Sequence, residues 1–231
     1  MKNLRDLEIN DLKKLLEEMG EKPFRAKQIY TWLHQNLVEH YDEMTNISKG
    51  LRDRLSAEYS VALPETVEVL TSKIDGTKKF IFRMQDGHVI ESVWMEYQHG
   101  HSVCISSQVG CRMGCKFCAS TLDGLARNLT SGEMLGQIYQ IQRTTGARVD
   151  NIVIMGSGEP LDNYDEFTRF IRMISDENGL HISRRNITIS TCGLVPKIRQ
   201  LADENYGITL ALSLHAPNDE TRKTLMPIAN K

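Results

Sequence analysis

The sequence predicts an α/β protein in which a small helical module and a β-meander precede an incomplete (β/α) barrel. Near the N-terminus apolar residues recur at helical spacing, and strand-like runs separated by Asp-Gly pairs follow them. Strands then alternate with helices to the end of the chain, which is typical of a parallel sheet. The 231 residues contain about four such β/α units. A closed eightfold barrel alone needs about 250 residues, so we expect a partial barrel or an open sheet.

Residues 1–60 predict an N-terminal helical accessory domain. Leucines at helical spacing lead up to Gly20, and glycine suits the position just after a helix. Pro23 fits the first turn of a second helix, and Ser48 fits the cap of a third.

Residues 61–97 predict a β-meander. The runs VEVLTSK, KKFIFRM and HVIESVWM have strand character, and Asp75-Gly76 and Asp86-Gly87 lie between them. Asp-Gly between two such runs is a strong β-hairpin signal. We therefore expect antiparallel strands joined by two tight turns.

Residues 98–231 predict the β/α core, beginning with the strand HSVCISS. Thr130 and Glu133 have the spacing of a capping box, which marks the start of a helix. Further strands are expected at 151–155, 186–190 and 208–214, and helices around 134–141, 167–174 and 197–204. Barrel enzymes carry their functional groups at the C-terminal ends of such strands.

Charge and hydropathy exclude two broad classes of protein. Lys and Arg total 28 against 30 for Asp and Glu, so the net charge of −2 excludes a globally basic nucleic-acid binder. A local basic rim could still be formed by Arg112, Lys116, Arg127, Arg184 and Arg185. No apolar run approaches the roughly 20 residues of a membrane span, and the start MKNLRDLEIN is not a secretory signal. We expect a cytoplasmic monomer with no membrane association.

The cysteines carry the strongest chemical signal. They are Cys104, Cys111, Cys115, Cys118 and Cys192. An odd number, with three crowded into one short stretch, does not fit a disulfide framework. Three thiolates at C-x3-C-x2-C spacing suit an iron–sulfur cluster with one iron left open, and that iron can bind amino and carboxylate groups of a small molecule. Structural zinc is the alternative, with Cys104 or His101 as a fourth ligand.

The string SVCISSQVGCRMGCKFCAST resembles the radical S-adenosylmethionine (SAM) superfamily and, within it, the RlmN/Cfr family of adenine-methylating RNA methyltransferases. Further segments agree with this family nearly from end to end: IESVWM, LDGLARNLTSGEMLGQI, IVIMGSGEPLDN, ISTCGLVP and LSLHAPNDETRKTLMPI. The resemblance implies an incomplete radical-SAM barrel. It also implies two cofactors, a 4Fe–4S cluster and SAM.

The resemblance implies that the cluster ligands are Cys111, Cys115 and Cys118, with Phe117 beside the cluster. The implied SAM contacts are Gly158, Glu159, Ser190, Ser213 and His215. From the residues alone, a Gly turn after a strand lets backbone approach a ligand, and a carboxylate can bind the ammonium of methionine. A lone Ser at a strand end would more often be a turn residue.

Two further residues have roles only through the resemblance. Glu91 matches the family's proton acceptor, whereas its pattern alone indicates a solvated strand residue. Cys104 matches the resolving thiol, which forms a transient disulfide with a methyl-carrying cysteine in the family's C-terminal segment. No cysteine follows Cys192 here, and Cys192 matches a barrel position with no carrier role. We therefore expect a C-terminally truncated member that does not turn over.

The activity implied is methylation of carbon 2 of adenine in 23S rRNA and in tRNA, with flavodoxin or ferredoxin as electron donor. Methylation at carbon 8, as in Cfr, is the close alternative, and LDGLARNL and ISTCGLVP fit the carbon-2 branch as well or better. Two other classes stay open for this chain. It could cleave SAM without methylating RNA, or it could be a non-catalytic RNA- or ribosome-binding remnant.

Overall fold

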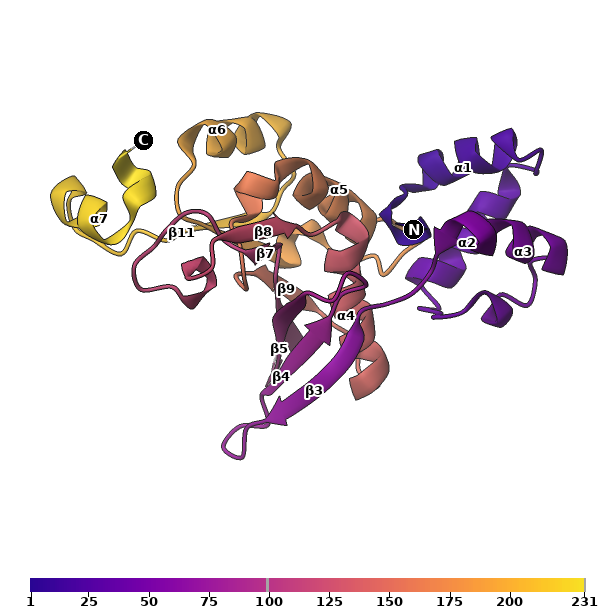
Figure 1. The fold of residues 1–231 in the computed structure, drawn as a ribbon, viewed down its shortest axis with the longest axis horizontal. Coiled ribbons are helices and arrows are strands. Elements are labelled where there is room, and N and C mark those ends of the chain that lie inside the picture. The colour runs from indigo at the N-terminus through magenta and orange to yellow at the C-terminus, as the bar shows by residue number, and fades with distance from the viewer. Residues whose placement is uncertain (99, 231) are drawn as a thin grey trace.

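The computed structural model describes residues 1–98 and 100–230, and a seven-stranded mixed sheet lies at its centre (Figure 1). The strand order is β11-β10-β9-β6-β5-β4-β3. The strands are β3 (Glu65–Thr71), β4 (Lys78–Arg83), β5 (Val89–Tyr97), β6 (Gly100–Ile105), β9 (Asn151–Ile154), β10 (Ile187–Thr191) and β11 (Thr209–Leu212). Strands β6, β9, β10 and β11 run parallel, and β3 to β6 run antiparallel. The α/β class and the open barrel are confirmed.

The N-terminal segment folds into the helices α1 (Ile9–Glu18), α2 (Phe24–His34) and α3 (Lys49–Glu58). The predicted helix boundaries are confirmed at two points. Gly20 follows α1 with a φ of 75°, and the Ser48 hydroxyl accepts the Leu51 N–H at the start of α3. A short parallel bridge between β1 (Lys2–Asn3) and β2 (Tyr59–Ser60) brings the two ends of this segment together.

Arg5 holds the N-terminal segment together from within. Its side chain is fully buried, and its guanidinium donates hydrogen bonds to the carbonyls of Leu33, Val38 and Val61. Five fixed N–H donors let one arginine satisfy several carbonyls at once. The next residue connects this segment to the core, because the Asp6 carboxylate accepts the Gly132 N–H (3.0 Å) at the start of helix α4 (Ser131–Thr145).

The β-meander is confirmed, and its turns contain the two predicted Asp-Gly pairs. Strand β5 also pairs with β6, with Val93 opposite Cys104. The meander and the parallel strands therefore form one continuous sheet. The division of the chain at residues 97–98 stays a prediction.

The helices α5 (Tyr164–Ile174) and α6 (Val195–Glu204) follow the parallel strands β9 and β10 as predicted. Helix α4 lies between β6 and β9 in the chain and starts with the predicted capping box. The buried side of the sheet carries residues such as Ile105, Ile154 and Ile189, which are at most 1% exposed. Alternate residues on the same strands face the opposite, open side. That side therefore carries the partly exposed Cys104 and Ser190.

Several short elements were not predicted. Strands β7 (Gln108–Gly110) and β8 (Leu125–Asn128) form a separate two-stranded ribbon, and α7 (Asp219–Leu225) follows β11. The short 3-10 turns are Leu4–Asp6, Tyr41–Glu43, Ala119–Thr121, Pro160–Asn163, Arg184–Asn186 and Pro227–Asn230. The ribbon and α7 flank the cysteine-bearing loop, so both contribute to the site.

Candidate cofactor site

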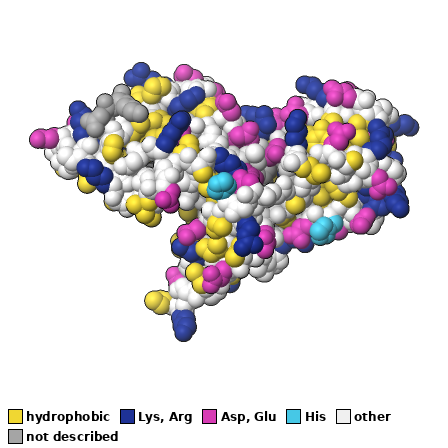
Figure 2. All heavy atoms as spheres, in the orientation of Figure 1, with side chains coloured by type: hydrophobic (Ala, Val, Ile, Leu, Met, Phe, Trp, Pro, Cys, Tyr) yellow, Lys and Arg dark blue, Asp and Glu magenta, His cyan; other side chains and the backbone are white. Residues whose placement is uncertain are grey.

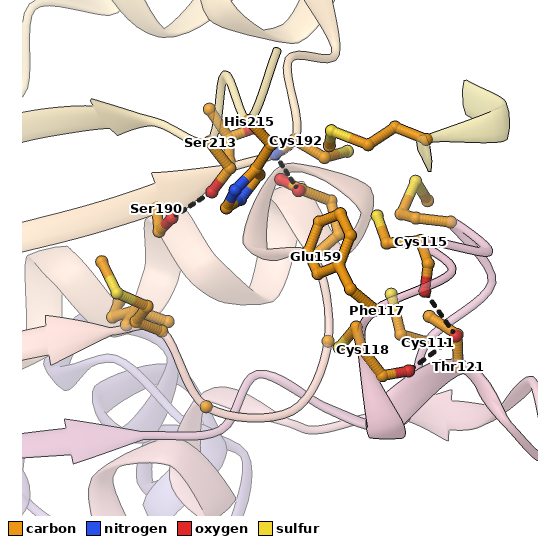
Figure 3. A pocket seen from close by; sticks show the side chains of 17 residues that line it. Cys111, Cys115, Phe117, Cys118, Thr121, Glu159, Ser190, Cys192, Ser213 and His215 are labelled. Atoms are coloured by element: carbon orange, nitrogen blue, oxygen red, sulfur yellow. Dashed lines mark hydrogen bonds between the residues drawn. The ribbon is translucent and has the colours of Figure 1, made fainter. Parts of the chain in front are cut away.

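An open cavity lies between the cysteine loop and the C-terminal ends of the parallel strands (Figure 3). Its lining includes all eight residues predicted to hold the cluster or SAM: Cys111, Cys115, Cys118, Gly158, Glu159, Ser190, Ser213 and His215. The chain thus brings four separate segments together at one edge of the sheet: the cysteine loop and the segments at the ends of β9, β10 and β11.

The cysteine loop is held at its base by the β7–β8 ribbon. The Cys111 N–H donates to the Gly124 carbonyl (2.9 Å). Gly110 has a φ of 73°, and a Cβ there would lie 2.0 Å from the same carbonyl, so only glycine fits. Inside the loop, the Thr121 hydroxyl bonds the carbonyls of Cys115 (3.1 Å) and Cys118 (2.9 Å). The loop is therefore fixed at its base and braced across its turn.

The three thiols have the chemistry of a metal-binding set. Burial raises the pKa of the Cys111 thiol to about 11 and also raises that of Cys115, so both thiols carry their protons near neutral pH. A metal centre would displace these protons, because thiolates are the ligands. Among residues 1–98 and 100–230, no three His, Cys, Asp or Glu side chains are grouped to hold a metal ion as they stand. Three sulfur donors on one braced loop, facing a cavity, nevertheless fit an iron–sulfur cluster by donor type.

Phe117 and His215 form an aromatic pair across the cavity. Phe117 projects from the cysteine loop toward His215, and their ring centroids are 4.6 Å apart (Figure 3). Phe117 is 53% exposed, so it is not an ordinary core aromatic. The two rings come from opposite sides of the cavity, one from the loop and one from the segment after β11.

Gly158 occupies a position that only glycine can fill. Its φ is 104°, and a Cβ there would lie 2.6 Å from the Gln108 Cβ and 2.8 Å from the Gln108 nitrogen. The Gln108 amide oxygen in turn accepts the Glu159 N–H (2.8 Å). The turn after β9 is therefore seated directly on the residue that begins β7.

The Glu159 carboxylate is 3% exposed and joins two loops. One oxygen accepts the Leu161 N–H (3.1 Å), and the other accepts the Cys192 N–H (2.7 Å) after β10. A carboxylate oxygen can accept more than one hydrogen bond, so capacity remains for a ligand ammonium. The contacts observed here nonetheless give Glu159 a structural role that its motif did not indicate.

We expect Glu159→Gln to destabilise the fold by about 2 kcal/mol and to weaken SAM binding. The amide keeps the shape but turns an NH₂ group toward one of the two backbone N–H donors, leaving it unsatisfied in a buried position. Urea unfolding and equilibrium dialysis with SAM measure the two effects. Glu18→Gln, which changes an exposed residue, is the control. Glu166→Gln is unsuitable because the Glu166 carboxylate accepts the Ser131 N–H at the start of α4. Unchanged stability and affinity in Glu159→Gln would contradict the expectation.

Ser190 and Ser213 lie on neighbouring strand ends. Their hydroxyls are 2.9 Å apart and hydrogen-bonded to each other. Ser190 is the last residue of β10 that faces the open side of the sheet, and it is paired with Ala211 on β11. Ser213 is the first residue after β11. Both hydroxyls line the cavity and can exchange this mutual bond for one to a ligand.

Glu91 and Cys104 do not line the cavity. They lie on the open side of the sheet, because Val93 is paired with Cys104 and Glu91 stands two residues before Val93 on β5. Glu91 forms an ion pair with Lys79, with 2.8 Å between Oε2 and Nζ, and both side chains are about half exposed. Burial raises the pKa of the Cys104 thiol. The roles of these two residues stay predictions.

The suggested basic rim is partly neutralised within the chain. Arg112 binds Asp162 through two nitrogens, with Nε 2.9 Å from one carboxylate oxygen. Arg127 binds both oxygens of Glu133 (2.7 and 2.8 Å). Figure 2 shows basic and acidic side chains interspersed over the visible face, without a single basic patch.

The cavity contains sulfur atoms that sequence reasoning did not assign to it. Cys192, Met113 and Met226 line it and pack with the cluster cysteines. Burial, with the nearby Glu159 carboxylate, raises the pKa of the Cys192 thiol strongly. The position of Cys192 just after a strand was the one available signal, and nothing in the sequence pattern indicated Met226.

Within the described part of the chain, no helix combines the length and apolar character needed to cross a membrane.

Comparison with known proteins identifies the family. The model of the ribosomal RNA large subunit methyltransferase N-terminal domain matches residues 2–61, and the radical SAM superfamily model matches residues 105–230. The probable dual-specificity RNA methyltransferase RlmN of Lachnoclostridium phytofermentans is 62% identical over 99% of this chain and 64% of its own length. The same-named protein of Clostridium novyi is 52% identical over 100% of this chain and 67% of its own length.

A solved structure agrees with this result. The crystal structure of a radical SAM methyltransferase from Sphaerobacter thermophilus matches with a TM-score of 0.93 and 41% identity, over 100% of this chain and 68% of that one. The chain spans about two thirds of the length of the curated relatives it matches. It belongs to the RlmN/Cfr family of the radical SAM superfamily.

Proposed function

We propose that the whole protein methylates carbon 2 of adenine in 23S rRNA and in tRNA by radical SAM chemistry. One observation carries this proposal: a single cavity is lined by the three loop cysteines together with the Gly158–Glu159 turn and the serines of the strand ends. The relatives' printed names, which are those of dual-specificity RNA methyltransferases, support the substrate class. Carbon 8 remains the alternative position on adenine.

In this proposal the cluster ligands are Cys111, Cys115 and Cys118. When bound, a 4Fe–4S cluster with one open iron supplies the electron that cleaves SAM reductively. The chain's own contribution is to hold three thiolates on a braced loop and to give up their protons to solvent as the cluster is loaded. Flavodoxin or ferredoxin is the proposed electron donor.

The remaining cavity residues suit the parts of SAM. The backbone at Gly158 is open to close approach, because no side chain intervenes. The hydroxyls of Ser190 and Ser213 can bond polar groups of the ligand. The faces of Phe117 and His215 suit the flat adenine ring. These residues would bind and orient SAM and restrict the access of water.

Glu91 is the proposed proton acceptor, and Cys104 is the proposed resolving thiol. Both lie on the open side of the sheet, and this side suits the adenine substrate because it is continuous with the strands that reach the cavity. The family's methyl-carrying cysteine belongs to a C-terminal segment. We propose that the 231-residue chain cleaves SAM without methylating RNA, as a cytoplasmic monomer.

Anaerobic reconstitution tests the cofactor proposal. We expect about four irons per chain and a cluster whose spectrum changes when SAM is added, because one iron lacks a protein ligand. Reductant should then convert SAM to 5′-deoxyadenosine and methionine. Stoichiometric zinc with no iron-dependent cleavage of SAM would refute the proposal in favour of a structural zinc site.

Labelled SAM separates the remaining alternatives. Reconstituted chain, reductant and 23S rRNA are incubated together, and the adenines are analysed for methyl label. SAM cleavage without label supports the methylation-inactive form. Label on carbon 2 would show that this chain turns over and would give Cys104 or Cys192 the carrier role. RNA binding without cluster or cleavage would favour the non-catalytic remnant.

A further inference from the structure

The segment from Asp219 to Met226, here called the strap, connects the strand ends with the cysteine loop. It consists of α7 and the residue after it. The Lys116 N–H, inside the cysteine loop, donates to the Leu225 carbonyl (2.9 Å). Met226 is 1% exposed and packs against the cluster cysteines. The loop that carries the thiols therefore rests on the strap.

Arg222 fixes the strap to the strand ends. Its guanidinium donates to three carbonyls: those of Cys192, Ser213 (3.4 Å) and Leu214 (3.2 Å). These carbonyls follow β10 and β11, two strands whose ends line the cavity. A planar guanidinium suits this task because its N–H groups diverge in a fixed geometry. One side chain thus joins two strand ends to α7.

The charge of Arg222 is not matched by a carboxylate. None of the ion pairs found among residues 1–98 and 100–230 includes it. Its partners are neutral carbonyls, so a full positive charge stays beside the cysteine loop. Arg222 lies on α7, and the last residue of this helix, Leu225, accepts the Lys116 N–H of the cysteine loop (2.9 Å), so the helix that carries the charge also contacts that loop. A loop that must hold three thiolates benefits from such a charge.

We propose that Arg222 is a positioning residue of the cofactor site, which clamps the strap to the strand ends and supplies a positive charge to the cysteine loop. The role given to the charge rests on the proposed function, in which the cysteine loop holds an iron–sulfur cluster. The clamp itself belongs to the chain and operates without a cofactor. The two parts can therefore be tested separately.

Hydrogen exchange in the metal-free chain tests the clamp. Peptides covering residues 111–118 should exchange on the order of tenfold faster in Arg222→Gln, because the hydrogen bonds of a charged group are lost. Arg222→Lys keeps the charge but lacks the diverging N–H groups of the guanidinium, so these peptides should exchange at an intermediate rate. Arg199→Gln, which changes an exposed arginine on α6, should leave the exchange of these peptides unchanged.

The reduction potential of the reconstituted cluster tests the charge. Loss of a nearby cation should make the potential of Arg222→Gln more negative, while Arg222→Lys and Arg199→Gln should stay close to the unaltered chain. Unchanged exchange and unchanged potential in Arg222→Gln would overturn the inference. If the unaltered chain takes up no cluster, the proposed function fails, and the exchange result still decides the clamp. If Arg222→Gln does not fold, as judged by circular dichroism, the Lys variant gives the exchange comparison.

Discussion

Replacing Cys115 by Ala is expected to abolish cluster assembly and SAM cleavage together. The loop offers three thiols, and Cys115 is the middle one, with its carbonyl braced by Thr121. A cluster left with two protein ligands loses a further anchoring bond and should not survive purification. The iron content after anaerobic reconstitution should fall from about four per chain to background, and 5′-deoxyadenosine formation should fall with it.

Cys104→Ala is the matched control for this experiment. Cys104 is also partly buried, but it lies on β6 outside the cavity lining. It should retain its iron and its SAM cleavage. Full iron content in Cys115→Ala would mean that another group replaces this thiolate, and Cys192 would be the first residue to examine, since it lines the same cavity.

Replacing Gly158 by Ala is expected to destabilise the fold by roughly 2–5 kcal/mol and to eliminate measurable SAM binding. The positive φ disfavours any side chain, and the added methyl group would overlap both the Cβ and the nitrogen of Gln108. This overlap can be relieved only if the turn that carries Glu159 moves. The Glu159 N–H is itself hydrogen-bonded to the Gln108 side chain. Denaturant unfolding measures the stability, and equilibrium dialysis on the reconstituted chain measures SAM binding.

Gly76→Ala separates the crowding effect from backbone strain. Gly76 has a similarly positive φ of 73°, but an added Cβ would meet nothing within 4 Å. Its cost should be limited to the strain, roughly 1–2 kcal/mol, and SAM binding should be unchanged. If both variants lost the same stability and neither lost SAM affinity, the close seating of Gly158 on Gln108 would be irrelevant to the site.

Local signals in the sequence predicted the regular elements well. The Asp-Gly hairpins, the cap at Ser48 and the capping box at Thr130 each depend on residues close together in the chain, and each is present in the structure. The alternation of strands and helices also predicted the parallel strands. These features need no knowledge of tertiary contacts, which is why sequence patterns suffice for them.

The site was only partly predictable, because it depends on distant residues. The motif residues of the cavity stood out by their spacing and by the family resemblance. The Glu159 bond to the Cys192 backbone and the Arg222 clamp join segments that are 33 and 30 residues apart, and no periodic pattern encodes them. The β7–β8 ribbon was missed for a related reason: its strands are only three and four residues long and enclose the cysteine loop.

The neighbouring roles of Arg5 and Asp6 have a consequence for how the chain unfolds. Arg5 is enclosed by carbonyls of the N-terminal segment, while the very next side chain satisfies a backbone N–H at the start of α4. Melting the N-terminal helices would release both residues at once and would leave α4 without one of its caps. We therefore expect the N-terminal segment and the sheet to unfold together, so that heating does not remove one while the other persists.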